Sequence, residues 1–290
     1  MANSHELHFA TIWENVSDAV PNNIAVISGN REKTWREYEI EASKLAAFLD
    51  ERGIKENVKV GLYLHNCNEY LEAQFGIFKV MGVPVNVNYR YQAGELKYLL
   101  DNSDCEAVFF QSCYADQVNE IAKDLPKIQT WIKVGEDSSG LASFAFNYSS
   151  VIRTYKPMPR IKRKEDNIYM IYTGGTTGMP KGVMYTHEDF AISMFGVLKL
   201  QGYTVPDVRK KENIVKLSSM IQDMNKNNSM IKCLIACPLM HGTGMFLGGF
   251  TTHVLGGCII TLPKLGLDPE LLLKQVKSTK ATSCLLYTSD

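Results

Sequence analysis

Residues 172–187 read YTGGTTGMPKGVMYTH, a stretch rich in glycine and threonine that carries one proline and one lysine. The apolar run NIYMIY at 167–172 comes directly before it and is typical of a buried strand. Thr186 begins the sequence THED, in which an acidic residue follows three positions after a threonine, and this pattern predicts the start of a helix. The stretch is therefore expected to be a glycine-rich bend that joins a strand to a helix.

A bend of this composition is suited to holding phosphate groups. Glycines let several backbone N–H groups point into one concavity, where they can bind phosphate oxygens. Lys181 adds a positive charge, and Pro180 restricts the backbone directly before it. The spacing differs from the ordinary P-loop, because three residues separate Gly174 from Gly178 and the lysine does not follow directly. A plain glycine turn without a ligand is the alternative that the residues themselves leave open.

The composition is that of an ordinary globular protein. The chain has 290 residues, of which 45% are hydrophobic, and its formal net charge is zero. This charge balance argues against nucleic acid or an anionic membrane as a partner. No apolar run is long enough to span a bilayer, and the N-terminus resembles no signal peptide. The seven cysteines include no CxxC pair; we expect Cys233 and Cys237 to be packed thiols in a reducing, cytoplasmic setting.

Helix and strand signals alternate along the first third of the chain, which predicts an α/β fold with mainly parallel sheets flanked by helices. Helices are expected at 9–19, 35–49, around 71–78 and at 94–100, and strands at 24–27, 58–64, 83–87 and 107–110. The polar segment 135–166 is expected to be a surface connection between two subdomains, 1–165 and 166–290, with its charged run PRIKRKED facing solvent. Segment 209–228 is either a mobile helix or flap near a site, or an inert surface insert.

The string TGGTTGMPKGVM resembles the phosphate-binding signature of the adenylate-forming, AMP-binding superfamily, which includes acyl- and aryl-CoA synthetases. It departs from the common form at Gly175, where serine or threonine is usual; this removes one hydroxyl donor. PLMHGTGMF at 238–246 resembles the Pro-Leu-x-His segment of acyl-CoA synthetases, and His241 fills its histidine position. A lone histidine in this place is otherwise more often structural. We expect His187 to cap a helix and His253 to be packed in the core.

The resemblance implies the N-terminal domain of an ATP-dependent acyl-CoA synthetase, which forms acyl-AMP from a fatty or steroid-type acid and passes the acyl group to coenzyme A. Lys181 and Thr173 are the implied catalytic residues, with Thr173 near Mg²⁺, and His241, Gly242 and Thr243 would line the acyl pocket. The implied nucleotide-binding residues are Thr173, Gly174, Gly175, Thr176, Thr177, Gly178 and Lys181. An aryl-CoA ligase and a non-catalytic nucleotide-binding module are the alternatives, and a homodimer is left open.

Later motifs of the family, which bind adenine and ribose and form the C-terminal lid, do not occur in the sequence. We therefore expect a lid-less N-terminal fragment that is inactive, or nearly so, in acyl-AMP formation. The last seven residues, CLLYTSD at 284–290, also match the translation of a common sequencing adapter, which suggests a gene fragment whose read continued into adapter.

Overall fold

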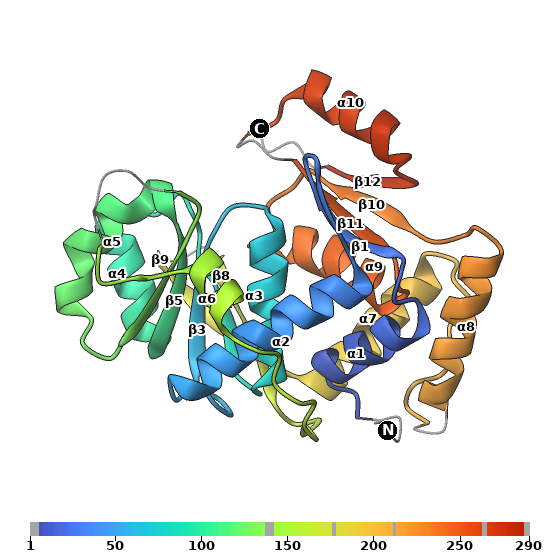
Figure 1. Cartoon of the computed structure of the whole chain (residues 1–290), viewed down its shortest axis with the longest axis horizontal. Helices are drawn as coiled ribbons and strands as arrows, with labels where there is room; N and C mark the ends of the chain where they lie inside the picture. Colours follow the sequence, from blue (N-terminus) through green and yellow to red (C-terminus); the bar gives the residue numbers. More distant parts are fainter. Residues whose placement is uncertain (1–5, 137–141, 176–177, 211–212, 263–265, 287–290) are drawn as a thin grey trace.

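The structure is a computed structural model, and it describes residues 6–136, 142–175, 178–210, 213–262 and 266–286. Two five-stranded sheets enclose a central layer of helices, and further helices cover their outer faces (Figure 1). The helices are α1 Phe9–Ala19, α2 Trp35–Glu51, α3 Asn68–Lys79, α4 Ala93–Asn102, η1 Ser112–Tyr114, α5 Ala115–Ile121, η2 Ala122–Asp124, α6 Tyr148–Thr154, α7 His187–Leu200, α8 Ile214–Lys226, η4 Thr243–Phe250, α9 Thr251–Val254 and α10 Pro269–Thr279. The strands are β1 Ile24–Ser28, β2 Arg31–Thr34, β3 Lys59–Tyr63, β4 Val83–Asn86, β5 Cys105–Gln111, β6 Thr130–Val134, β7 Phe146–Asn147, β8 Ile168–Gly175, β9 Gly178–Thr186, β10 Lys232–Ile235, β11 Cys258–Thr261 and β12 Ser283–Leu285.

The first sheet, sheet A, combines strands from both ends of the chain in the order β12-β10-β11-β1-β2. Its pairs are parallel except for the β1–β2 hairpin. From β10 the chain goes to β11 on one side, and from there to β12 on the other. The order therefore reverses at β10, and the carboxyl end of such a strand is a common ligand site in open α/β sheets.

The second sheet, sheet B, has the order β4-β3-β5-β6-β7 and parallel pairs throughout. The chain passes from β3 to β4 on one side, then returns across β3 to β5 on the other. This sheet therefore has its own switch point, between β3 and β5. The predicted α/β fold with mainly parallel sheets flanked by helices is confirmed.

The main hydrophobic core lies between the two sheets. Buried aromatic side chains of α1, α2 and α3, among them Phe9, Trp13, Trp35 and Phe75, fill this layer together with the inner faces of both sheets. A second core lies between sheet B and helices α4 and α5, and a smaller third core lies under α10 on sheet A. The proposed boundary between subdomains 1–165 and 166–290 stays a prediction, although β1 pairs in sheet A with β11, a strand of the second stretch.

The charged run at 159–166 does not simply face solvent, and that expectation is wrong for Arg163. Its guanidinium is buried and contacts the Glu14 carboxylate through both terminal nitrogens at 2.8 Å, while Lys79 Nζ reaches the same carboxylate at 2.7 Å. Arg160 forms a two-point contact with Asp18 on α1. The segment therefore anchors the central helices through ion pairs, a role that charge alone does not reveal.

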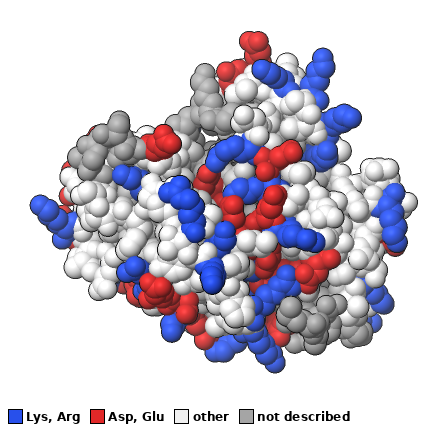
Figure 2. All heavy atoms as spheres, viewed as in Figure 1, with Lys and Arg blue, Asp and Glu red and all other residues white. Residues whose placement is uncertain are grey.

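Across the middle of the face in Figure 2, basic and acidic side chains are intermixed. Within segment 209–228, residues Ile214–Lys226 form helix α8, whose Ile214, Leu217 and Ile221 side chains are buried, and α8 packs against α1. Within the described ranges, the structure contains no helix long and apolar enough to cross a membrane.

Candidate functional site

The glycine-rich stretch forms an antiparallel hairpin, not the expected strand-to-helix bend. Strand β8 continues to Gly175, and a second strand, β9, begins at Gly178 and runs to Thr186 before α7 starts. Thr173 pairs with Lys181 across the hairpin. Directly opposed residues of an antiparallel pair have their side chains on one face, so the hydroxyl and the ammonium group emerge on the same side. Thr176 and Thr177 lie outside the described residues.

Local packing explains why the hairpin forms. A Cβ atom on Gly182 would lie 3.0 Å from the Tyr172 ring and 3.2 Å from Met170 Sδ, so glycine lets the two strands approach with these side chains between them. At the end of β9, the Thr186 hydroxyl accepts the backbone N–H of Asp189 at 3.0 Å. The predicted helix start after Thr186 is therefore confirmed.

Three of the predicted phosphate-binding residues are accessible. Thr173, Gly174 and Lys181 are exposed, and a Cβ atom on Gly174 would meet nothing within 4 Å. In the part of the chain that the structure describes, no carboxylate forms an ion pair with Lys181. The ammonium group is thus available to an anion, and Gly174 leaves open space beside the Thr173 hydroxyl.

His241 leaves sheet A at its switch point, after the carboxyl end of β10. The turn 237–241 leads into η4, a π-helical segment whose N-cap is Gly242. Gly244 must be glycine, because a Cβ atom there would lie 2.3 Å from the carbonyl oxygen of Pro238. Short π-helical segments are rare and often occur at functional sites.

The His241 side chain is half-buried. Its burial, together with the nearby charge of Arg90, lowers the pKa of the imidazole below its ordinary value, so the ring is neutral at neutral pH. Thr243, the first residue of η4, is exposed. A neutral, partly desolvated imidazole beside an exposed threonine can line a pocket for an apolar chain with a polar end.

Two asparagines that the sequence analysis missed hold the predicted site segments in place. The Asn86 amide receives the N–H of Tyr172 at 2.6 Å and donates to the carbonyl oxygens of Tyr172 at 3.0 Å and Met240 at 2.6 Å. Asn66 donates to the Cys237 carbonyl at 2.9 Å and accepts the Leu239 N–H at 2.8 Å. Asn86 thereby joins the hairpin to the His241 segment. One available signal was an asparagine within the apolar run VPVNV, because asparagine is uncommon in strands.

Two other histidines have structural positions. His187 caps a helix, but the helix is α1 and not α7: its Nδ1 accepts the Phe9 N–H at 3.2 Å. The His187 ring stacks on His8, with 3.8 Å between the ring centroids. His253 is packed among Trp13 and Trp35 and contacts the Ala25 carbonyl, as predicted.

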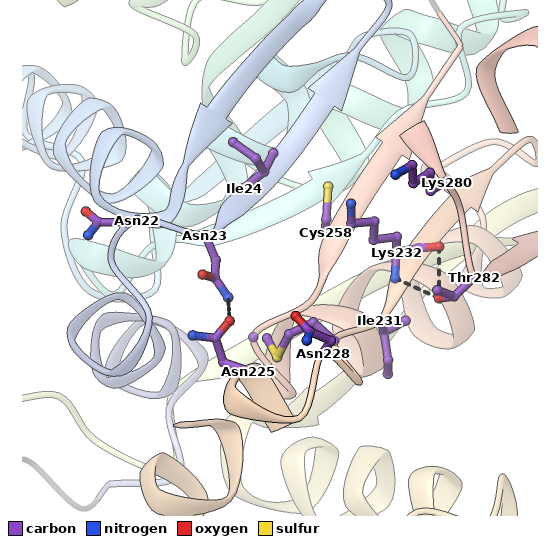
Figure 3. Close-up of a pocket in the computed structure, with 12 residues that line it drawn as sticks. Asn22, Asn23, Ile24, Asn225, Asn228, Ile231, Lys232, Cys258, Lys280 and Thr282 are labelled. Carbon is purple, nitrogen blue, oxygen red and sulfur yellow. Dashed lines mark hydrogen bonds between the residues drawn. The ribbon is translucent and has the colours of Figure 1, made fainter. Parts of the chain in front are cut away.

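The structure also has a 580 Å³ pocket at the opposite edge of sheet A (Figure 3). Ile24, Lys232 and Cys258, the first residues of β1, β10 and β11, line it, and Lys280 ends α10 beside it. Lys232 Nζ donates to the carbonyl of Thr279 at the end of α10, so this lysine complements a helix C-terminus. The amino ends of parallel strands are not the usual ligand edge, and none of the predicted site residues lies in this pocket.

The cysteine side chains and possible metal ligands can be placed in the described part of the chain. Cys233 and Cys237 are buried free thiols, as expected. Among the residues that the structure describes, no group of three or more His, Cys, Asp or Glu side chains could hold a metal ion.

Comparisons with known proteins show the family of the chain. The family model for AMP-binding enzymes matches residues 13–289. A medium/long-chain-fatty-acid and 3-oxocholest-4-en-26-oate CoA ligase of Mycolicibacterium smegmatis is 35% identical over 98% of this chain and 50% of its own length. A 3-oxocholest-4-en-26-oate CoA ligase of Rhodococcus rhodochrous is 39% identical over 63% of this chain and 34% of its own.

Solved structures share the fold. A crystal structure of the anthranilate CoA ligase AuaEII superposes with a TM-score of 0.79 at 18% identity, over 98% of this chain and 50% of that one. The N-terminal domain of FACL13 from Mycobacterium tuberculosis superposes with a TM-score of 0.77 at 18% identity, over 96% of this chain and 62% of that one. The chain spans about half the length of the M. smegmatis ligase. On the family match and on the 35% identity over nearly its whole length, the chain belongs to the AMP-binding, adenylate-forming enzymes, in the branch of the acyl-CoA synthetases.

Proposed function

We propose that the chain is the N-terminal portion of an ATP-dependent acyl-CoA synthetase whose substrate is a medium- or long-chain fatty acid or a steroid acid. The relatives at 35% and 39% identity are named for these substrates. One structural observation carries the proposal: the Thr173–Lys181 pair, on one face of an exposed hairpin, is tied through Asn86 to the segment that bears His241. A phosphate-binding element and an acyl-binding element are thereby held in one fixed relation.

In this proposal the two elements serve two successive steps. A carboxylate oxygen of the acid attacks the α-phosphorus of ATP, the bond to pyrophosphate breaks, and acyl-AMP forms. The thiol sulfur of coenzyme A then attacks the acyl carbon, and AMP leaves. Neither step needs a covalent bond to the protein, so positioning and charge stabilisation provide the rate enhancement.

Each residue has a defined part in these steps. The Lys181 ammonium counters negative charge on the β- and γ-phosphates as pyrophosphate departs. The neutral His241 ring lies along the acyl chain, with Gly242 and Thr243 beside it. Magnesium is usually held by one or two carboxylates together with substrate phosphates. Thr173 fits as a single oxygen ligand to such an ion, which would offset phosphate charge when bound.

Inorganic triphosphate tests the hairpin without requiring an adenine pocket. Isothermal titration calorimetry of the 290-residue chain should show triphosphate binding that Lys181→Ala weakens at least about tenfold, because a charge-assisted contact contributes about 1.5–3 kcal/mol. Lys199→Ala, at an exposed position of α7, is the matched control and should bind as the unaltered chain does. Equal affinities of the Lys181 variant and the control would contradict the assignment of the phosphate site.

A pyrophosphate-release assay with a panel of fatty and steroid acids tests the catalytic part. We propose that the 290-residue chain alone gives no turnover, because it lacks the family's adenine, ribose and lid motifs. Robust turnover would overturn this part of the proposal and would leave the phosphate site intact.

A further inference from the structure

A tyrosine at the base of the hairpin is held through its backbone and through its side chain. The Tyr172 backbone exchanges two hydrogen bonds with the Asn86 amide, at 2.6 and 3.0 Å. Its hydroxyl, at the far end of the side chain, donates to Asn102 Oδ1 at 2.8 Å. Asn86 ends strand β4 and Asn102 ends helix α4, so the two asparagines hold Tyr172 from two different elements.

The hydroxyl contact fixes the orientation of the hairpin as well as its place. Backbone bonds at one residue allow the strand to rotate about that residue, whereas a further contact at the end of a long side chain opposes the rotation. Successive side chains of a strand point to opposite faces. Because Tyr172 belongs to the core between sheet B and α4, Thr173 points outward, to the face that it shares with Lys181.

Asn102 is a firm support for this contact. The turn that follows it is closed by a backbone hydrogen bond of 3.0 Å from the Asp104 N–H to the Asp101 carbonyl oxygen. Asp104 has a φ of +53°, in the left-handed region that aspartate tolerates better than most residues. Strand β5 begins directly afterwards, at Cys105, and lies in the middle of sheet B. The asparagine is therefore attached to the centre of the sheet.

The surroundings of the Tyr172 side chain preserve the contact. The residue is 8% exposed, and burial raises the pKa of its hydroxyl to about 12, so the hydroxyl keeps the proton that it donates. Gly182 lies opposite Tyr172 in the hairpin, and a Cβ atom there would lie 3.3 Å from Cζ, the ring carbon that bears the hydroxyl. Glycine thus leaves the ring the room in which its hydroxyl reaches Asn102.

From these contacts we propose that Asn102 is a positioning residue of the phosphate-binding hairpin: through the Tyr172 hydroxyl, it holds Thr173 and Lys181 in the orientation that binds phosphate groups. The inference rests on the proposed function of the hairpin. Asn102 acts through Tyr172 and not by contact with the phosphates.

Loss of the contact should therefore weaken phosphate binding in a chain that still folds. The bond is partly exposed and joins two neutral groups, so its effect is that of one ordinary hydrogen bond. If the contact served stability alone, folded variants that lack it would bind triphosphate with full affinity. If it positions the hairpin, folded variants bind triphosphate about threefold to tenfold more weakly.

Calorimetry with inorganic triphosphate on the 290-residue chain tests this, at a temperature where urea unfolding curves show each variant to be fully folded. Tyr172→Phe and Asn102→Leu should each weaken binding about threefold to tenfold. The double variant should bind no more weakly than the weaker of the two single variants, because both changes remove the same bond. Tyr98→Phe, which removes a hydroxyl from a half-buried tyrosine of α4, is the matched control and should bind as the unaltered chain does.

Amide hydrogen exchange in the chain without triphosphate gives a second readout. Both single variants should exchange about threefold to tenfold faster in β9, and at the rate of the unaltered chain in α1. If one variant does not fold, the other variant decides by the same two measurements.

The outcomes separate this inference from the phosphate site itself. Triphosphate binding that depends on Lys181 but not on Tyr172 or Asn102 would overturn the positioning role and leave the phosphate site intact. Losses that multiply in the double variant, or an equal loss in Tyr98→Phe, would also overturn it. Absence of triphosphate binding by the unaltered chain would refute the phosphate site. The exchange rates of β9 would then decide the positioning role, and unaltered rates in both variants would overturn it.

Discussion

The side-chain amide of Asn86 donates to the carbonyl oxygen of Met240 at 2.6 Å, across 154 residues of sequence. The same amide bonds to both backbone groups of Tyr172, the residue before Thr173. Asn86 ends an edge strand of sheet B, and Met240 precedes His241 at the switch point of sheet A. One side chain therefore sets the position of the hairpin relative to the predicted acyl pocket.

Replacing Asn86 should cost stability and triphosphate binding together. Asn86→Leu leaves the Tyr172 N–H and two carbonyl oxygens without their partner, and each buried unpaired group costs about 1–3 kcal/mol. We expect urea denaturation to show a loss of about 3 kcal/mol or more in the free energy of unfolding. Asn22→Leu, at an exposed position, should change stability by less than about 0.5 kcal/mol. Full triphosphate affinity in folded Asn86→Leu would show that the hairpin holds its position without this bridge.

The sequence predicts those helices and strands that neighbouring residues in the chain determine. The bounds of α1, residues 9–19, were predicted as observed, because apolar side chains recur at helical spacing there. The hairpin was missed because β9 begins with glycine and contains Pro180, residues that are uncommon in strands. Residues 178–186 form a strand because they pair with β8, and β8 in turn packs beside β4. The residue preferences of segment 178–186 do not reveal either its pairing with β8 or the contact of β8 with the distant strand β4.

The same distinction applies to the site. Lys181 and Thr173 were identified by a motif, but their position on one face of a hairpin depends on register, which becomes known only from the paired strands. Arg163 looked like a solvated charge because its partner, Glu14, is 149 residues away. Asn66 and Asn86 bond to backbone atoms of distant segments. Because every residue has these backbone atoms, the sequence of the distant segments does not indicate the contact.

Acid should destabilise the fold through its buried histidines. Burial lowers the pKa of His187 to about 3 and lowers that of His8 well below its ordinary value, so both rings stay neutral in the native state. Between about pH 6.5 and pH 3 the unfolded chain binds more protons than the native state, and stability therefore falls as pH decreases. One such histidine contributes a slope of about 1.4 kcal/mol per pH unit in this window.

Denaturation at several pH values between 7 and 4.5 measures this slope. His187→Gln keeps a side-chain acceptor for the Phe9 N–H but cannot bind a proton, so it should make the decline shallower by about 1.4 kcal/mol per pH unit below about pH 6. The unaltered chain is the reference in the same buffers. An identical pH dependence of the two proteins would mean that His187 is not held neutral by burial.

The buried ion pairs of Arg163 should contribute strongly to folding. Arg163→Met removes the guanidinium and leaves Glu14 with Lys79 as its remaining buried partner, so we expect a loss of about 3–5 kcal/mol in the free energy of unfolding. Lys162→Met changes the neighbouring exposed residue and should alter stability by less than about 0.5 kcal/mol. Similar losses in both variants would argue that residue 163 acts through general surface charge.

Two glycine substitutions should change stability in opposite directions. Gly244→Ala places a Cβ atom 2.3 Å from the Pro238 carbonyl oxygen, so the turn that carries His241 must shift. We expect destabilisation of about 1–3 kcal/mol, as for other overpacked sites. In Gly196→Ala, within α7, the new Cβ atom meets nothing within 4 Å, and the higher helix propensity of alanine should stabilise the fold by about 0.5–1 kcal/mol. Thermal unfolding of both variants measures the two signs. A stabilised Gly244→Ala protein would show that the turn before η4 has room which the structure does not give it.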